Sequence, residues 1–277
     1  MIRQADRLIY TEMMDTTPLV YIGINLAHDS YDHDREAVID AALAAGVDHM
    51  VITGSSLPSI QAAIVLCESR PAVFRTTAGI HPHHASGVDT QVVAALRQFL
   101  AHPLVAAVGE CGLDYFRDFS PRHEQRLAFE RQLQLAIDHD KPLFLHQREA
   151  HRDFMDMLRP ALPQIPAAVL HCFTGGRAEL EECLEAGLQV GITGWICDER
   201  RGEALREAVP HLPLDRLMVE TDGPYLLPRD LPTKPSSRRN EPKYLRHIVE
   251  TISRIMERPA AAVATASTIN ARRFFGF

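Results

Sequence analysis

Short, continuous apolar runs alternate with longer amphipathic segments from residue 19 to the end of the chain. Continuous apolar runs are typical of parallel strands, which are buried on both faces when helices cover the sheet. Several amphipathic segments end at a glycine, as in AAGVD and EAGLQ, which is typical of a helix C-terminus. The predicted strands are 19–26, 49–54, 72–80, 104–110, 141–146, 167–173, 188–194 and 215–223, and the predicted helices are 34–45, 58–69, 89–100, 121–139, 150–158, 177–186, 202–208, 244–256 and 260–274.

Eight successive strand–helix units predict an α/β fold of the (β/α)8 TIM-barrel type, in which residues 19–277 form a single catalytic domain. Residues 1–18 are expected to be an N-terminal extension. A doubly wound open sheet is the alternative, but no G-x-G-x-x-G motif follows the first predicted strand. The long irregular stretch 223–242 lies inside the last unit, so we interpret it as a functional loop rather than a domain linker.

Composition narrows the class of partner and the compartment. A net charge of −7 does not suit a protein that coats duplex DNA non-specifically, because such binding needs many cationic side chains. The five cysteines are scattered and never spaced as C-x-x-C, which argues against a disulfide framework or a structural zinc site and favours a reducing compartment. No apolar run reaches the ~20 residues needed to span a bilayer, and the N-terminal segment lacks the apolar core of a secretory signal. We therefore predict a cytoplasmic protein with no membrane partner.

The stretch VAAVGECGLDY reads as a buried strand that ends on a lone carboxylate, Glu110. Burying an unpaired carboxylate costs several kcal/mol or more unless a cation or hydrogen bonds compensate it. In a barrel the C-terminal ends of the strands meet at one face, and other strands also end on metal-ligand residue types. Two histidines and two carboxylates at these ends predict a site with nitrogen and oxygen ligands for a divalent cation. A bound cation would compensate the buried Glu110, and the ligand-type residues at the other strand ends are His81, His146, His171 and Asp222.

Other polar residues near these strand ends have less definite roles. His81 ends the third strand and is expected to bind substrate phosphate or a second metal, whereas His83 and His84 are interpreted as solvated loop residues. Asp114 either caps the following turn or holds a ligand. Side chains alternate along a strand, so the cysteines that follow two predicted ligands, Cys111 and Cys172, should point away from the centre.

The loop PYLLPRDLPTKPSSRRNEP extends from the strand that supplies Asp222 and carries several cations. It should therefore lie over the mouth of the site. Guanidinium groups bind phosphate with paired hydrogen bonds, so Arg238 and Arg239 are predicted to contact a phosphate-bearing substrate. The other cations of this loop are Arg229, Lys234 and Lys243.

Five motifs together resemble the TatD family of metal-dependent deoxyribonucleases: TAGIHPHH, VGECGLDYFRDFSPRHEQ, VLHCFTGG, GITGWICDERRG and ETDGPYLLPRDLPTKPSSRRNEP. The resemblance implies a TIM barrel whose metal ligands correspond to Glu110, His146, His171 and Asp222. It implies a 3'-to-5' exonuclease that prefers single strands of DNA, with RNA as a further substrate, supported by Mg²⁺ and associated with DNA repair. Many members carry H-x-H at the first strand; this chain has Asn25 there and no histidine pair, which argues against a fully occupied two-metal site.

The mechanism that we expect is metal-assisted hydrolysis of the terminal phosphodiester, which releases a 5'-mononucleotide. Glu110 and Asp222 are the predicted catalytic carboxylates, with Asp222 accepting a proton from water or completing the coordination. His81, Arg148 and the loop arginines are predicted to bind substrate, and Tyr225 or Trp195 to stack on a base. The resemblance favours Mg²⁺, whereas imidazole ligands would also suit Mn²⁺ or Zn²⁺.

Two other functions compete with this prediction. The same barrel and ligands could serve a metal-dependent hydrolase of small-molecule or aminoacyl-tRNA esters and amides, but the basic loop favours a phosphate-bearing substrate. A non-catalytic binding protein with a decayed site is less consistent with the presence of all four ligand types. We therefore expect a monomer that acts on the 3' ends of single-stranded DNA or RNA.

Overall fold

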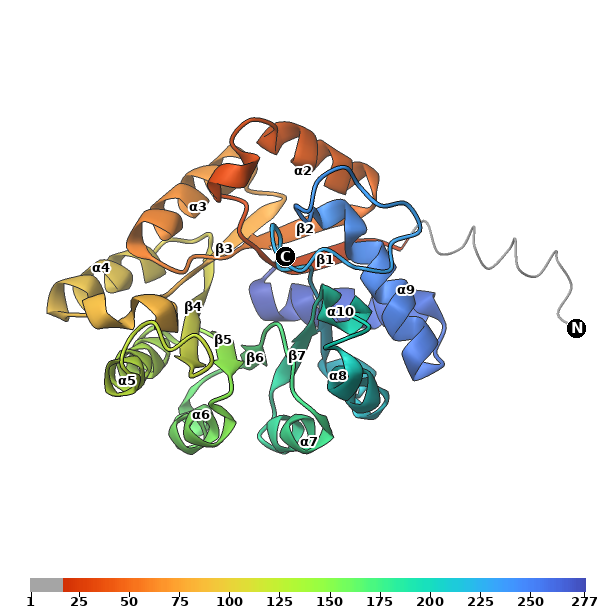
Figure 1. The fold of residues 1–277 in the computed structure, drawn as a ribbon. Coiled ribbons are helices and arrows are strands. Elements are labelled where there is room, and N and C mark those ends of the chain that lie inside the picture. The colour runs from red at the N-terminus through yellow and green to blue at the C-terminus, as the bar shows by residue number, and fades with distance from the viewer. Residues whose placement is uncertain (1–16) are drawn as a thin grey trace, which may run out of the picture.

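The computed structural model describes residues 17–277 and confirms the predicted barrel. Eight parallel strands form one sheet in the order β1 to β8, and the helices surround it (Figure 1). The ring closes where the backbone N–H of Asn25, after β1, donates to the carbonyl of Gly223, after β8, at 2.9 Å. The strands are β1 (Leu19–Ile24), β2 (Val47–Ile52), β3 (Phe74–Ala78), β4 (Val105–Asp114), β5 (Leu143–Arg148), β6 (Ala168–Leu170), β7 (Gln189–Ile192) and β8 (Leu217–Val219). Residues 1–16 of the expected N-terminal extension lie outside the described residues.

The helices lie close to their predicted positions and follow the strands in alternation. Their starts have local causes: Ser56 and Ser59 form a capping box before α3, and the side chain of Asp89 accepts two backbone N–H bonds at the start of α4. The helices are α2 (Arg35–Ala44), α3 (Leu57–Ser69), α4 (Thr90–Leu100), α5 (Arg122–His139), α6 (His151–Leu158), α7 (Arg177–Glu185), α8 (Glu203–Ala208), α9 (Leu245–Met256) and α10 (Ala260–Phe275). No helix within residues 17–277 is long and apolar enough to cross a membrane.

The predicted end of β4 at Glu110 is wrong, because the strand continues to Asp114 through an irregularity in its pairing. Val108 pairs with Leu143 and Cys111 with Leu145, so Gly109 and Glu110 together oppose Phe144 alone. A bulge of this kind re-aims the side chains of the bulged strand. The bulge directs the side chain of Glu110 into the barrel. The alternation of a regular strand would not have fixed the direction of this side chain.

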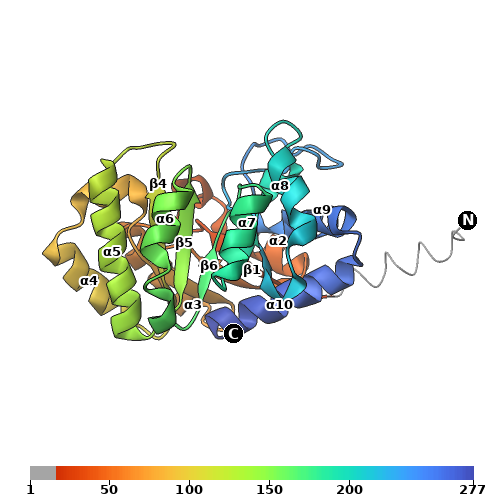
Figure 2. The same ribbon diagram turned by 90° about the horizontal axis from the view of Figure 1, so that it is seen from below.

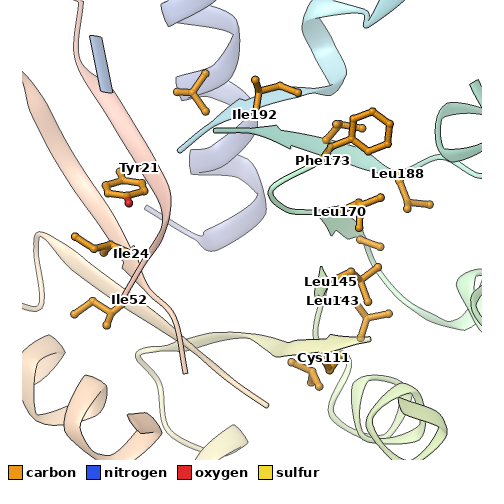
Figure 3. Packing of buried hydrophobic residues seen from close by; sticks show 14 of the residues in the cluster. Tyr21, Ile24, Ile52, Cys111, Leu143, Leu145, Leu170, Phe173, Leu188 and Ile192 are labelled. Atoms are coloured by element: carbon orange, nitrogen blue, oxygen red, sulfur yellow. The ribbon is translucent and has the colours of Figure 1, made fainter. Parts of the chain in front are cut away.

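The core has two layers that leave one end of the barrel free for the site. The outer layer packs strands against the surrounding helices; Figure 3 shows part of it, including Leu143, Leu145 and Leu170. The inner layer lies among the strands and includes Val20 and Phe144, which pack with Phe275 of α10. Figure 2 shows α10 running along one edge of the barrel, whereas the loops after β4 and β8 rise at the opposite edge.

Candidate metal centre

Glu110 is the hub of a cluster of histidines at the open end of the barrel. Its Oε1 lies 2.7 Å from His171 Nε2, 3.2 Å from His146 Nδ1 and 3.3 Å from His81 Nε2. Burial alone would raise the pKa of the Glu110 carboxyl, but the charges of His81 and His171 and the hydrogen bonds from His146 and His171 outweigh it. Its pKa therefore lies well below the usual value. The Oε1 atom of Glu110 thus contacts three imidazole groups. A divalent cation bound between this oxygen and the imidazole nitrogens could take the place of these direct contacts.

His81 belongs to this cluster more closely than the sequence indicated. The ligand atoms of His81, Glu110 and His146 all lie within 4.8 Å of one another. They come from the ends of β3, β4 and β5, which are neighbours in the sheet. The substrate-binding role predicted for His81 is therefore one of two roles that its position allows, the other being that of a metal ligand.

Asp114 combines the two roles that the sequence left open. Its Oδ1 accepts backbone hydrogen bonds from Phe116 at 3.1 Å and Arg117 at 2.8 Å, which caps the turn after β4. Its Oδ2 lies 2.9 Å from His83 Nε2 and 3.3 Å from His146 Nε2. The interpretation of His83 as a solvated loop residue is therefore wrong, because the short 3-10 turn Pro82–Gly87 folds it back over Asp114. His84, on the same turn, is exposed as expected.

Asp222 lies on the β8 side of the same opening and is not in direct contact with Glu110. Its Oδ1 accepts a long hydrogen bond of 3.5 Å from Asn25 Nδ2. Burial raises the pKa of Asp222 to about 8, and the negative charges of Glu110 and Glu220 add to this, whereas His171 opposes it. The structure thus gathers Glu110, His146 and His171 and brings Asp222 within electrostatic reach of them.

The donor set fits a divalent cation. Within residues 17–277 the ion pairs of Glu110 and Glu220 are formed with histidines and not with lysine or arginine. Burial is the main cause of the raised pKa of Asp222, and repulsion by the carboxylates of Glu110 and Glu220 adds to it. A divalent cation with nitrogen and oxygen ligands would relieve that repulsion.

Glu220 is the one buried carboxylate of the site that sequence reasoning missed. It is fully buried, and its Oε1 accepts the backbone N–H of Cys172 at 2.6 Å while its Oε2 lies 3.3 Å from His171 Nδ1. A Cβ on Gly23 of β1 or Gly191 of β7 would overlap its carboxylate, so these glycines make room for it. In the sequence ETD, Glu220 lies two residues before Asp222. Side chains two residues apart on a strand point to the same face, so this spacing was the available signal that Glu220 belongs to the site.

Glu220→Gln is expected to lower kcat about 10- to 100-fold with a much smaller change in KM. The reason is that a carboxylate behind a ligating histidine fixes its tautomer and orientation, and loss of such a partner typically has an effect of this size. Cleavage kinetics would be measured together with cation affinity by calorimetry, and a thermal melt would show that the variant is folded. A folded variant whose kcat and cation affinity both stay within twofold of wild type would contradict this role.

A basic hollow of about 820 Å³ lies between the segment after β7 and the loop after β8. Arg201 and Arg229 line it but are paired with Asp198 and Glu199. Lys234 and Arg238 also line it, and neither forms an ion pair within the described part of the chain. The contact of Arg238 with a substrate phosphate stays a prediction.

Arg239 does not share this position, which argues against the substrate-binding role predicted for it. Its guanidinium donates to both oxygens of Asp34, at 2.7 and 2.6 Å, and to Glu241 at 3.0 Å. Asn240 adds side-chain hydrogen bonds to the carbonyls of Thr221 and Tyr225. Arg239 and Asn240 therefore hold the base of the loop in place. The neighbouring Arg238 lies in a different environment, along the hollow.

The aromatic candidates also differ. Tyr225 is 53% exposed beside Asp222, which leaves its ring available for stacking. Trp195 is only partly exposed, and Arg201 lies 4.3 Å and Arg148 5.6 Å from its ring, so Tyr225 offers the more open ring of the two. The guanidinium of Arg148 pairs with no carboxylate within residues 17–277, so it is available for a phosphate.

The two cysteines that follow candidate ligands behave differently from each other. Cys111 is fully buried in the outer core, as expected. Cys172 is partly exposed, and its Sγ lies 3.6 Å from Thr193 Oγ1. The alternation rule failed there because β6 ends at Leu170 and Cys172 has a left-handed backbone, with φ of 46°.

This chain is similar to known proteins over nearly its whole length. A family model described as TatD related DNase matches residues 22–276. A relative from Musicola paradisiaca, named 3'-5' ssDNA/RNA exonuclease TatD, is 52% identical over 92% of this chain and 96% of its own length, and one of the same name from Erwinia amylovora is 50% identical over 92% and 98%. The crystal structure of YJJV, a TATD homolog from Escherichia coli k12, has a TM-score of 0.85 at 25% identity and covers 94% of this chain and 98% of that one. The fold and the motifs thus lead to the same result, and the chain belongs to the TatD related DNase family.

Proposed function

We propose that this protein is a metal-dependent 3'-to-5' exonuclease that removes 5'-mononucleotides from single-stranded DNA or RNA. The observation that carries the proposal is the contact of Glu110 with His171, His146 and His81 at the open end of the barrel. The relatives at about 50% identity carry a name that states the same polarity and substrates, and the chain covers nearly their whole length.

We assign Glu110, His146, His171 and Asp222 as ligands of one cation, with His81 as a further candidate. A cation in this position supplies Lewis-acid polarisation of a phosphoryl oxygen and an acidic water at neutral pH. Glu110 and Glu220 hold His171 from opposite sides, so its imidazole keeps one orientation. Asp222 and Glu110 are the proposed catalytic carboxylates. A bound cation would favour the ionised form of Asp222 and so offset the rise in its pKa, and Asp222 is then the group to which we assign the proton of the attacking water.

Substrate binding is assigned to the rim of the opening. Arg148 and Arg238 carry guanidinium groups without a carboxylate partner in the described residues and suit phosphate oxygens. Tyr225 offers an exposed ring beside Asp222. Unpaired bases can stack on such rings, whereas the bases of a duplex are already stacked on one another, which favours single strands.

The remaining properties are proposed from family likeness and composition. We propose Mg²⁺ as the cation in cells, with Mn²⁺ and Zn²⁺ as competitors because imidazole suits them. A single catalytic domain over residues 19–277, a monomeric state, a cytoplasmic location and a role in DNA repair complete the proposal.

The test uses purified, metal-stripped protein and a single-stranded oligonucleotide labelled at its 5' end. Mg²⁺, Mn²⁺ and Zn²⁺ would be added back separately, and DNA, RNA and duplex forms compared. We expect a ladder that shortens stepwise from the 3' end with the active ion and no ladder without it. If no ion supports cleavage of DNA or RNA, the nuclease is excluded, and small-molecule and aminoacyl esters become the substrates to examine.

A further inference from the structure

Two aromatic side chains stand exposed on the segment that connects β4 to α5. Phe116 is 48% exposed and Phe119 is 67% exposed, although most large apolar side chains of the described residues are buried. Exposed aromatic groups beside a site are typical of a binding surface. We refer to Phe116 and Phe119 as the aromatic platform.

The platform is connected to the metal centre through His83. The ring centroids of Phe119 and His83 lie 4.8 Å apart, with the rings inclined at 60°. His83 Nε2 in turn lies 2.9 Å from Asp114 Oδ2, which also contacts His146. A group resting on Phe119 would thus lie next to the histidines that surround Glu110.

The platform is connected to the basic hollow through a series of alternating cations and rings. The guanidinium carbon of Arg148 lies 4.0 Å from the centroid of Phe116 and 5.6 Å from that of Trp195. Arg201 lies 4.3 Å from Trp195 on the hollow side. Cations over aromatic faces are attracted to the rings and hold them in place. The series therefore joins two surfaces that come from different loops.

We propose that the aromatic platform binds an unpaired nucleobase of the substrate strand, next to the scissile phosphate, while Arg148 contacts a backbone phosphate. The proposal rests on the proposed nuclease function and assigns it a base-binding subsite. Its chemistry matches the ligand, because a nucleic acid strand alternates flat apolar bases with anionic phosphates at short intervals. Stacking accepts any base, so the subsite selects strandedness rather than sequence.

The experiment is a double-mutant cycle between protein and substrate. Phe116→Ala/Phe119→Ala and wild-type protein would each act on an intact single-stranded oligonucleotide and on two versions that lack the base of either the 3'-terminal or the adjacent nucleotide. We expect removal of the rings to raise KM for the intact strand roughly 5- to 150-fold, the range found when one stacked base loses its ring. Removal of the correct base should raise the KM of wild type by a similar factor, and the two losses should not multiply.

The Leu127→Ala variant is the matched control, because this exposed apolar side chain lies on α5, the helix that follows the platform in the chain. It should behave as wild type on all three substrates, and Phe116→Leu/Phe119→Leu should resemble the alanine variant because stacking needs a flat ring. The base-binding role of the platform would be overturned if the effects on KM of removing the rings and of removing a base multiply fully at both base positions. It would also be overturned if the alanine variant has a KM within twofold of wild type. In either case, cleavage of the intact strand by wild type would still establish the nuclease. Absence of cleavage by wild type itself would instead refute the proposed function.

Discussion

Glu110→Gln is expected to lower the rate of phosphodiester cleavage about a thousandfold or more while leaving the fold intact. Glutamine has the shape of glutamate, so packing inside the bulge of β4 is preserved. What disappears is the negative charge that faces His171, His146 and His81. Charges and donors aligned on a reacting group typically contribute factors of about 10² to 10⁴ each, and in the proposed centre Glu110 would both hold the cation and orient two of its other ligands.

Single-turnover cleavage of a labelled oligonucleotide would give the rate, and equilibrium dialysis would give the number of bound cations. Both should fall in the variant. Glu182→Gln is the control, because Glu182 pairs with Arg159 on the outside of the barrel and should leave the rate unchanged. A Glu110→Gln protein that binds the cation normally and retains more than about a tenth of the rate would remove Glu110 from the centre.

The sequence predicted the barrel and the proximity of Glu110, His146 and His171 because both depend on local signals. Apolar runs mark strands, and the C-terminal ends of parallel strands lie on one face whatever the details of packing. The proximity of Glu110, His146 and His171 therefore follows from the order of strands and strand ends along the chain. Their contacts within hydrogen-bonding distance depend on the bulge in β4, for which the glycines beside Glu110 were the only visible sign in the sequence.

Other parts of the site depend on partners that lie far away along the chain. The arginines at 238 and 239 look equivalent in the sequence, yet Arg239 meets Asp34 from the opposite end of the chain, and Arg238 faces the hollow. His83 appeared to be a loop residue because the turn that returns it to Asp114 is set by tertiary contacts. Pairings of this kind leave no periodic pattern, so charge and residue type alone could not distinguish them.

Gly112→Ala is expected to destabilise the protein by about 4 kcal/mol or more, although it adds a single methyl group. Gly112 has φ of 145°, a conformation that residues with a Cβ rarely adopt, and its added Cβ would overlap the backbone carbonyl of His146 on β5. Overpacking against side chains typically costs about 1–3 kcal/mol, because side chains can turn away. A backbone carbonyl inside a sheet cannot, so the strands themselves must separate and the loss should exceed that range.

The same displacement would move the backbone that carries the His146 imidazole, so Gly112→Ala links stability to the site. Urea unfolding would give the free energy of unfolding of the variant and of wild type. If too little of the variant can be purified for this measurement, the yield of soluble protein would be compared instead. Gly87→Ala is the control, since a Cβ there meets no atom within 4 Å, and it should change stability by no more than about 0.5 kcal/mol. If the two variants are equally stable, β4 and β5 do not approach as closely as described, and the geometry of Glu110 beside His146 would have to be revised with them.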